Sequence, residues 1–156
     1  WKKDIVSLEE IIWRALQVKR AIVEEDLYER GSRKKLNLGH TLAHALEAFH
    51  NYQISHGQAV AIGLLYSLRV SELLGLVDSS VRERLKNLFQ GLGLRIRVHG
   101  HKAKLLELMA QDKKNTEKGL NFVLLSARSG VIVKSEIDKK LLLEAMEEVI
   151  DENIDN

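Results

Sequence analysis

The spacing of hydrophobic residues predicts helices over most of the chain. Apolar residues recur at helical intervals from Ile11 onward, after a capping-box sequence at Ser7. This pattern predicts a first helix that runs to about Tyr28 and ends before Gly31. The stretch 57–74 is apolar on nearly every side, which indicates a helix buried in the core. Further helical patterns cover residues 41–49, 78–91, 105–112 and 141–150.

A few short stretches carry the pattern of β-strands instead. Residues 121–125 and 131–133 are apolar and rich in β-branched side chains, and the turn-forming stretch 127–130 separates them, so a two-stranded hairpin is expected. A weak strand is also expected over 95–98, and Asp138 is expected to cap the last helix. The pattern therefore predicts a mainly α fold, a multi-helix domain with a small β-hairpin.

The composition narrows the chemistry that this chain could perform. Its 156 residues include no cysteine and no proline, and aromatic residues make up 5%. Without cysteine, the chain has no disulfides, zinc–thiolate sites, iron–sulfur clusters or thiol nucleophiles. Without proline, its helices are expected to run uninterrupted. The length suits one domain of ordinary size, so residues 1–156 are expected to form a single domain with an aliphatic core.

Charge and hydropathy exclude several kinds of partner. The net charge is +2, from 24 basic and 22 acidic residues, and the basic runs 33–35 and 113–114 are too short to indicate nucleic-acid binding without a surrounding basic stripe. No stretch approaches 18 consecutive apolar residues, so no membrane-spanning helix is expected. The N-terminus lacks a hydrophobic signal region and an initiator methionine. We therefore expect a cytoplasmic protein and a chain that is part of a longer one.

Histidine placement is the main sign of chemistry. Four of the six histidines lie between residues 40 and 56. His40 and His44 are one helical turn apart, so their rings share one face at about 6 Å, a spacing that metal-binding helices use. The same spacing also suits two capped or partly buried histidines. His56 lies at a predicted helix start beside Gly57, where it could turn inward as a ligand or act as a cap.

Polar residues also gather in the segment before these histidines. Ammonium, guanidinium, amide and carboxylate groups near one point would suit a small polyoxygenated anion, with imidazole available for proton transfer. The alternative interpretation is a solvated charged face. The residues concerned are Lys19, Asp26, Glu29, Arg33 and Asn37.

Three blocks of this sequence resemble the signature of the 3-dehydroquinate synthase family. The first runs from Lys19 to Glu47 and includes Leu36-Asn-Leu-Gly-His-Thr-Leu-Ala-His44. The second is His56-Gly-Gln-Ala-Val-Ala-Ile-Gly63, and the third begins at Asp112-Lys-Lys and extends through Gly119 to Leu125. The blocks occur in the family's order, and the resemblance covers residues 19–133.

The resemblance implies a two-domain, NAD- and zinc-dependent lyase of the shikimate pathway, which serves aromatic amino acid biosynthesis. Such an enzyme converts 3-deoxy-D-arabino-heptulosonate 7-phosphate to 3-dehydroquinate and phosphate. The chain is similar to the helical C-terminal half, which implies that the N-terminal NAD-binding domain is absent from it and that this chain alone is inactive. Zinc or another divalent metal such as cobalt, NAD, and a homodimer of the full-length enzyme are implied as well.

The resemblance also assigns roles to individual residues. His40 and His56 match the two zinc-ligand histidines, and the third ligand of the family, a glutamate, would lie before Trp1. His44 therefore matches a catalytic proton-transfer residue rather than a ligand, and Glu29 matches a second acid/base residue. The substrate-binding positions are matched by Lys19, Arg33 and Asn37 and by one lysine of the pair Lys113 and Lys114.

Two residues depart from the family pattern. Ala43 stands where the family usually has glycine and is expected to tighten a helix contact. Gln58 stands where the family usually has glutamate after His-Gly, and is expected to alter a partner of the zinc histidines.

Two other hypotheses remain open from the sequence. A related sugar-phosphate cyclase such as 2-deoxy-scyllo-inosose synthase would share the zinc histidines but differ in its substrate contacts. Lys19 and Arg33, with Asn37, favour a substrate with a carboxylate, because a carboxylate needs cations. A helical binding module without chemistry is the second hypothesis, and it predicts neither zinc nor a cavity near His40.

Overall fold

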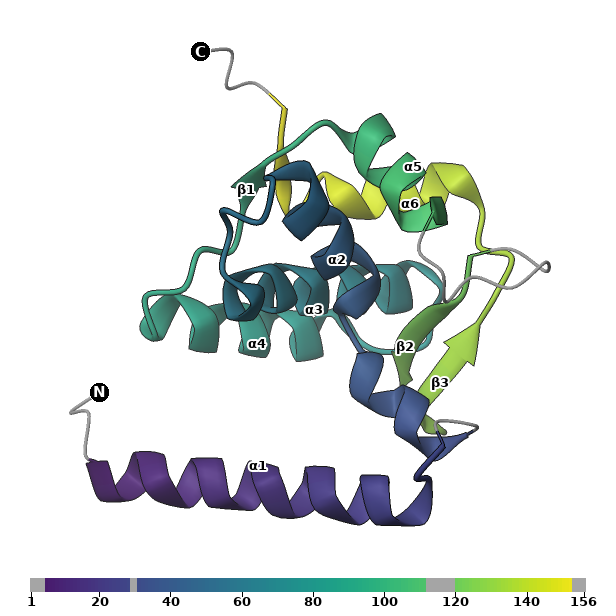
Figure 1. Cartoon of the computed structure of the whole chain (residues 1–156). Coiled ribbons are helices and arrows are strands. Elements are labelled where there is room, and N and C mark those ends of the chain that lie inside the picture. Colours follow the sequence, from purple (N-terminus) through teal and green to yellow (C-terminus); the bar gives the residue numbers. More distant parts are fainter. Residues whose placement is uncertain (1–4, 29–30, 112–119, 153–156) are drawn as a thin grey trace. The chain divides into compact units, whose positions relative to one another are not determined.

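The computed structural model describes residues 5–28, 31–111 and 120–152, with the side chains of 5–7 left out (Figure 1). The chain forms two compact units, Trp1–Asn37 and Leu38–Asn156. In the described part of the chain, no helix is both long enough and apolar enough to cross a membrane. The domain prediction for residues 1–156 stays a prediction.

The first unit consists of the helix α1 (Ile5–Glu25) and the 3₁₀ helix η1 (Ser32–Asn37). The predicted first helix is confirmed, although it ends a few residues before Tyr28. Asp26 follows it, and its Oδ2 accepts hydrogen bonds from the backbone N–H groups of Gly31, at 2.7 Å, and Arg33, at 3.1 Å. The Asp26 side chain thus closes the turn into η1 by satisfying N–H groups that a helix start leaves unpaired.

The second unit is built around one central helix, α3 (His56–Leu73). It packs against α2 (His40–Phe49), α4 (Ser79–Gly91), α6 (Lys139–Met146) and the strand β2 (Phe122–Ser126), while α5 (Lys102–Gln111) packs against α2 and α6. This accounts for the all-round apolar sequence of α3, because nearly every side of it meets another element.

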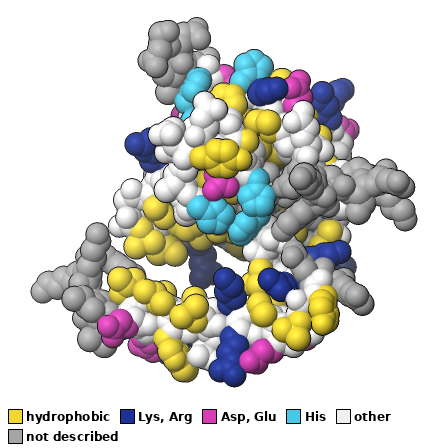
Figure 2. All heavy atoms as spheres, viewed as in Figure 1, with side chains coloured by type: hydrophobic (Ala, Val, Ile, Leu, Met, Phe, Trp, Pro, Cys, Tyr) yellow, Lys and Arg dark blue, Asp and Glu magenta, His cyan; other side chains and the backbone are white. Residues whose placement is uncertain are grey.

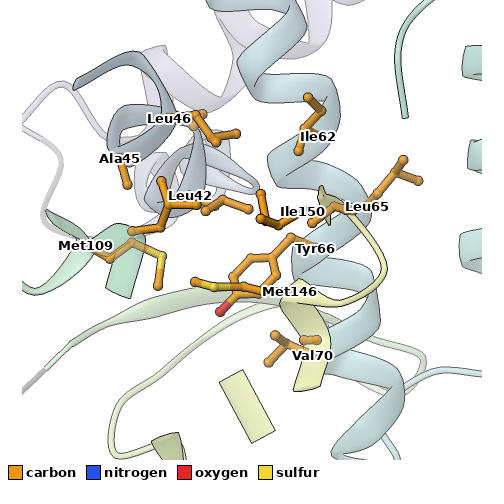
Figure 3. Packing of buried hydrophobic residues seen from close by; sticks show 14 of the residues in the cluster. Leu42, Ala45, Leu46, Ile62, Leu65, Tyr66, Val70, Met109, Met146 and Ile150 are labelled. Atoms are coloured by element: carbon orange, nitrogen blue, oxygen red, sulfur yellow. The ribbon is translucent and has the colours of Figure 1, made fainter. Parts of the chain in front are cut away.

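The core of the second unit is aliphatic, as the composition predicts. Figure 3 shows side chains from α2, α3, α5 and α6 meeting around Tyr66. The Tyr66 ring is completely buried, and its hydroxyl donates to the carbonyl oxygen of Leu142 at 3.4 Å. Burial raises the pKa of Tyr66 well above its ordinary value, so the hydroxyl stays protonated and keeps this bond. Its labelled neighbours include Leu42, Ile62, Leu65, Val70, Met109 and Met146.

Two small sheets complete the second unit. The predicted hairpin is confirmed: β2 pairs antiparallel with β3 (Gly130–Lys134) in a register that sets Leu124 opposite Ile132. The second sheet pairs β1 (Val98–His99) in parallel with β4 (Ile150–Asp151). The expected strand over 95–98 is therefore displaced toward the C-terminus and has an unexpected partner.

The prediction that the last helix reaches Ile150 is wrong, and Arg97 explains why. The helix α6 is capped at its start by Asp138, as predicted, but it ends at Met146. The Arg97 guanidinium donates to the carbonyl oxygens of Glu147 and Glu148, both at 2.8 Å, and to that of Ile150 at 3.0 Å. These contacts satisfy carbonyl groups at the helix end and release Ile150 to pair with β1.

Candidate functional site

The start of α2 lies directly on the backbone of α3. Gly39 precedes α2 with a φ of +83°, and a Cβ atom there would lie 2.8 Å from the backbone nitrogen of Leu64. Gly63 on α3 is closer still, because its Cβ would lie 2.0 Å from the carbonyl oxygen of Gly39. Two residues without side chains therefore bring the helices together beside His40, the first residue of α2.

Ala43 belongs to the same contact. It is completely buried, and its backbone nitrogen would lie 3.3 Å from a Cβ atom at Gly63. The expectation that Ala43 takes part in a close helix contact is consistent with this packing.

This arrangement gathers three histidines in the second unit. The ring centroids of His40 and His56 lie 5.5 Å apart, and those of His40 and His44 lie 5.6 Å apart. The start of α3 lies against the face of α2 that carries His40 and Glu47, so the His56 ring comes close to both. Histidine side chains gather beside acidic and apolar groups on the surface shown in Figure 2.

Hydrogen bonds define which ring nitrogens of the two predicted ligands are engaged. His56 Nδ1 lies 2.9 Å from Glu47 Oε1, and His40 Nδ1 lies 3.3 Å from the carbonyl oxygen of Leu38. A carbonyl or an ionised carboxylate accepts hydrogen bonds, so each Nδ1 carries the proton and donates. In the neutral form of each ring the lone pair is then on Nε2, which is the ring atom that could bind a metal.

The ring spacing suits shared coordination of a metal ion. A metal bound at about 2.1 Å from a ring nitrogen lies about 3.2 Å from that ring's centroid, so two rings in a tetrahedral arrangement have centroids about 5 Å apart. The centroid distances of both histidine pairs are close to this value. Among the described residues, however, no group of three or more His, Cys, Asp or Glu side chains is placed to hold a metal. His44 therefore does not complete a three-ligand set with His40 and His56, although zinc sites in proteins use at least three.

The other predicted site residues lie in the first unit or outside the described residues. Lys19 is exposed on α1, and Asn37 ends η1. Arg33 lies in η1, where its Nη1 donates to the carbonyl oxygen of Leu27 at 3.0 Å. Asp26 acts as the cap described above. The remaining predicted residues, Glu29, Lys113 and Lys114, lie outside the described residues.

The side chain of Gln58 pairs with the backbone of Arg95. Its Nε2 donates to the carbonyl oxygen of Arg95 at 2.6 Å, and the Arg95 backbone N–H donates to its Oε1 at 3.1 Å. This paired contact fixes the segment after α4 to the start of α3. The residue that contacts a predicted zinc histidine is instead Glu47, which the sequence analysis missed. Its position three residues after His44 and seven after His40, on the same helix face, was the available signal.

Comparison with known proteins identifies the family of this chain. Residues 2–115 match the family described as 3-dehydroquinate synthase C-terminal. The chain belongs to this family. Relatives named 3-dehydroquinate synthase from Corynebacterium glutamicum and Pyrococcus furiosus are 38% and 36% identical over 152 and 146 residues. These matches cover 96% and 94% of this chain but only 41% and 42% of the relatives' length.

Solved structures show the same fold in related cyclases. A 2-deoxy-scyllo-inosose synthase complexed with carbaglucose-6-phosphate, NAD⁺ and Co²⁺ matches 92% of this chain and 42% of its own with a TM-score of 0.79. A 2-epi-5-epi-valiolone synthase from Streptomyces hygroscopicus, with NAD⁺ and Zn²⁺ bound, covers 93% of this chain and 40% of its own with a TM-score of 0.78. At 22% and 18% identity, these structures establish the fold of the family member and nothing about its substrate.

Proposed function

We propose that this chain is the metal- and substrate-binding part of a 3-dehydroquinate synthase. The enzyme would convert 3-deoxy-D-arabino-heptulosonate 7-phosphate to 3-dehydroquinate and phosphate in the shikimate pathway. The observation that carries the proposal is the pair His40 and His56, 5.5 Å apart, each with Nδ1 against an acceptor oxygen. Family membership and relatives of 36–38% identity support the substrate.

His40 and His56 would hold zinc, or another divalent metal such as cobalt, through their Nε2 atoms. Two neutral imidazoles fit the donor preference of such a metal, and a third donor would come from outside the described residues. When bound, the metal supplies Lewis-acid polarisation of a substrate oxygen. NAD, when bound, accepts a hydride from the substrate and returns it, so the reaction consumes none.

The remaining proposed roles are proton transfer and anion binding. His44, whose ring centroid lies 5.6 Å from that of His40, would transfer a proton, and Glu29 would act as a second acid/base group. Phosphate leaves as its carbon–oxygen bond breaks, and a new carbon–carbon bond closes the ring. Cationic and amide side chains would orient the substrate's phosphate and carboxylate for these steps. Those side chains are Lys19, Arg33, Asn37, Lys113 and Lys114.

The chain spans about two fifths of its relatives' length, so a further part of the enzyme has to be included in the proposal. We propose that NAD is bound mainly by an N-terminal domain, that the full-length enzyme is a cytoplasmic homodimer, and that this chain alone releases no phosphate. The chain alone would have no binding site for NAD, the hydride acceptor. The reaction requires NAD to be held close to the reacting carbon of the substrate.

A chimera tests the proposal. This chain would replace the corresponding C-terminal part of the Corynebacterium glutamicum relative, and phosphate release from the heptulosonate phosphate would be measured with NAD and Zn²⁺. We expect turnover by the chimera, a loss of at least about 100-fold in His40→Ala and in His56→Ala, and none by the chain alone. His50→Ala is the matched control, because His50 Nε2 contacts the carbonyl oxygen of His99. A fully active His56→Ala chimera would refute the assignment.

Zinc binding by the chain alone is a second test. Two imidazoles without a carboxylate ligand leave the site short of a donor and of negative charge, so we expect weak binding that His40→Ala abolishes. Tight, stoichiometric binding that survives His40→Ala would contradict the site. Complete absence of binding, together with inactive chimeras, would favour a module without chemistry.

One alternative enzyme is a cyclase similar to 2-deoxy-scyllo-inosose synthase, whose fold this chain shares. The two candidates differ in the substrate, because the heptulosonate phosphate carries a carboxylate and carbaglucose-6-phosphate does not. Competition by carbaglucose-6-phosphate in the chimera assay separates them. We expect weak competition for a 3-dehydroquinate synthase, and strong competition would favour the alternative.

A further inference from the structure

Glu47 lies on the face of α2 that carries His40 and His44. It is one helical turn beyond His44 and two beyond His40, so the three side chains share that face. Its side chain is 16% exposed, whereas that of its partner His56 is 59% exposed. The carboxylate therefore holds a largely exposed ring from the protein side. Without such a contact, an exposed imidazole is free to rotate.

The contact selects one tautomer of His56. Because the Glu47 carboxylate accepts hydrogen bonds and His56 Nδ1 lies 2.9 Å from its Oε1, Nδ1 donates, and in the neutral ring the lone pair is on Nε2. The contact of His40 with the Leu38 carbonyl oxygen is longer, at 3.3 Å, and comes from its own chain neighbourhood. His56 thus depends on a side chain from a different helix for its orientation.

The turn between α2 and α3 does not need the Glu47 side chain. The backbone carbonyl oxygen of Glu47 accepts from the N–H of Tyr52 at 2.7 Å, and the Ser55 hydroxyl caps α3. These contacts persist whatever side chain residue 47 carries. A change of the carboxylate should therefore act on His56 rather than on the fold.

We propose that Glu47 is a positioning residue for His56, and this inference rests on the proposed metal site. The carboxylate holds His56 as the Nδ1–H tautomer with Nε2 available to a divalent cation shared with His40. Through its contact with the ligand His56, it also places a negative charge near the cation. Two neutral imidazoles supply no such charge. Carboxylates that orient metal-binding histidines in this way typically contribute about 10–100-fold to metal affinity.

The tautomer tests the proposal without any metal. Long-range ¹H–¹⁵N NMR spectra of the imidazoles, recorded on the metal-free chain at pH 8, should show His56 as the Nδ1–H form. In Glu47→Ala we expect a shift toward the Nε2–H form. Glu47→Gln keeps an acceptor oxygen and should retain the Nδ1–H form without the charge. Glu107→Gln is the matched control, since Glu107 is an exposed helical carboxylate that pairs with Lys104, and it should change neither ring.

A Zn²⁺ titration, followed by the same histidine resonances, tests the positioning role of Glu47 separately from the metal site itself. We expect Glu47→Ala to weaken binding about 10–100-fold and Glu47→Gln to weaken it less. Loss of zinc binding in His40→Ala tests the metal site itself, whatever Glu47 does. The positioning role is overturned if wild-type His56 is the Nε2–H form, or if Glu47→Ala binds Zn²⁺ within about twofold of wild type. Far-UV circular dichroism shows that each variant is folded.

Discussion

Gly63 lies so close to Gly39 that a Cβ atom at Gly63 would be 2.0 Å from the Gly39 carbonyl oxygen. The obstacle is backbone, so a small rotation of a side chain would not relieve it. The two helices that carry His40 and His56 can keep their present separation only while residue 63 has no side chain. This single contact links the packing of the second unit to the geometry of its candidate site.

Gly63→Ala is expected to destabilise the second unit by about 3 kcal/mol, because α2 must move away from α3. Urea unfolding monitored by circular dichroism measures the loss. Gly91→Ala is the control: Gly91 lies in α4 with no atom within 4 Å of its Cβ position, so alanine should be neutral or slightly stabilising. Equal stability of Gly63→Ala and wild type would show that the helices are not in such close contact.

Tyr52→Gly is expected to stabilise the chain by about 1 kcal/mol. Tyr52 has a φ of +60° in the turn before α3, a conformation that costs energy for a residue with a Cβ atom, and its side chain is 77% exposed. The gain is measured as a higher urea midpoint. Gln53→Gly, one residue later and outside the left-handed region, should instead lower the midpoint. A lower midpoint for Tyr52→Gly would contradict the strain.

Arg97→Lys is expected to cost about 1–2 kcal/mol, although it preserves the charge. A lysine ammonium lacks the planar fork with which Arg97 reaches several carbonyl oxygens after α6 and, through Nε at 2.7 Å, the carboxylate of Asp151. Amide hydrogen exchange tests whether the loss of stability is local to the β1–β4 pair. The amides of Val98 and Gly100, which donate to the Val149 and Asp151 carbonyl oxygens, should exchange faster. Arg95→Lys is the control, and unchanged protection in Arg97→Lys would contradict the role of the fork.

Stability is expected to fall on acidification, in part through Glu148. Partial burial raises the pKa of its carboxyl, but the Lys86 hydrogen bond and the charges of Arg82, Lys86 and Arg69 outweigh it and hold the pKa below its ordinary value. A group with a depressed pKa in the folded state contributes stability above its unfolded pKa, near 4.5. That contribution is lost as pH falls through the folded pKa. Urea unfolding between pH 6 and 3 should therefore show a shallower loss in Glu148→Gln than in wild type, and an identical slope would refute the pairing.

Elements that the neighbouring sequence defines were predicted well. The α6 start at Asp138 and the β2–β3 hairpin depend on a cap and a turn within a few residues, so local pattern suffices. The end of α6 and the β1–β4 pair depend on Arg97, about fifty residues away, and no local signal carries that information. The tertiary contact overrides the helical periodicity of residues 147–150.

The candidate site divides in the same way. The proximity of His40 and His56 followed from matched family blocks, whereas periodicity alone favoured His40 with His44. Glu47 shares their helix face, but its contact with His56 depends on how the turn reverses the chain. The contact of Gln58 with the Arg95 backbone was not predicted, because Arg95 lies in a segment that the helix pattern does not position.

The central position of α3 affects how the second unit unfolds. Since α2, α4, α6 and β2 all pack on this one helix, and their buried side chains belong to one cluster, loss of α3 removes part of the core of each. The Ser71 hydroxyl also ties the hairpin to α3, because it accepts from the backbone N–H of Leu125 and donates to the carbonyl oxygen of Ser67. We expect unfolding in one cooperative step. A destabilising substitution anywhere in the core, even far from His40 and His56, would then lower the fraction of folded molecules and with it the fraction that contains the histidine pair.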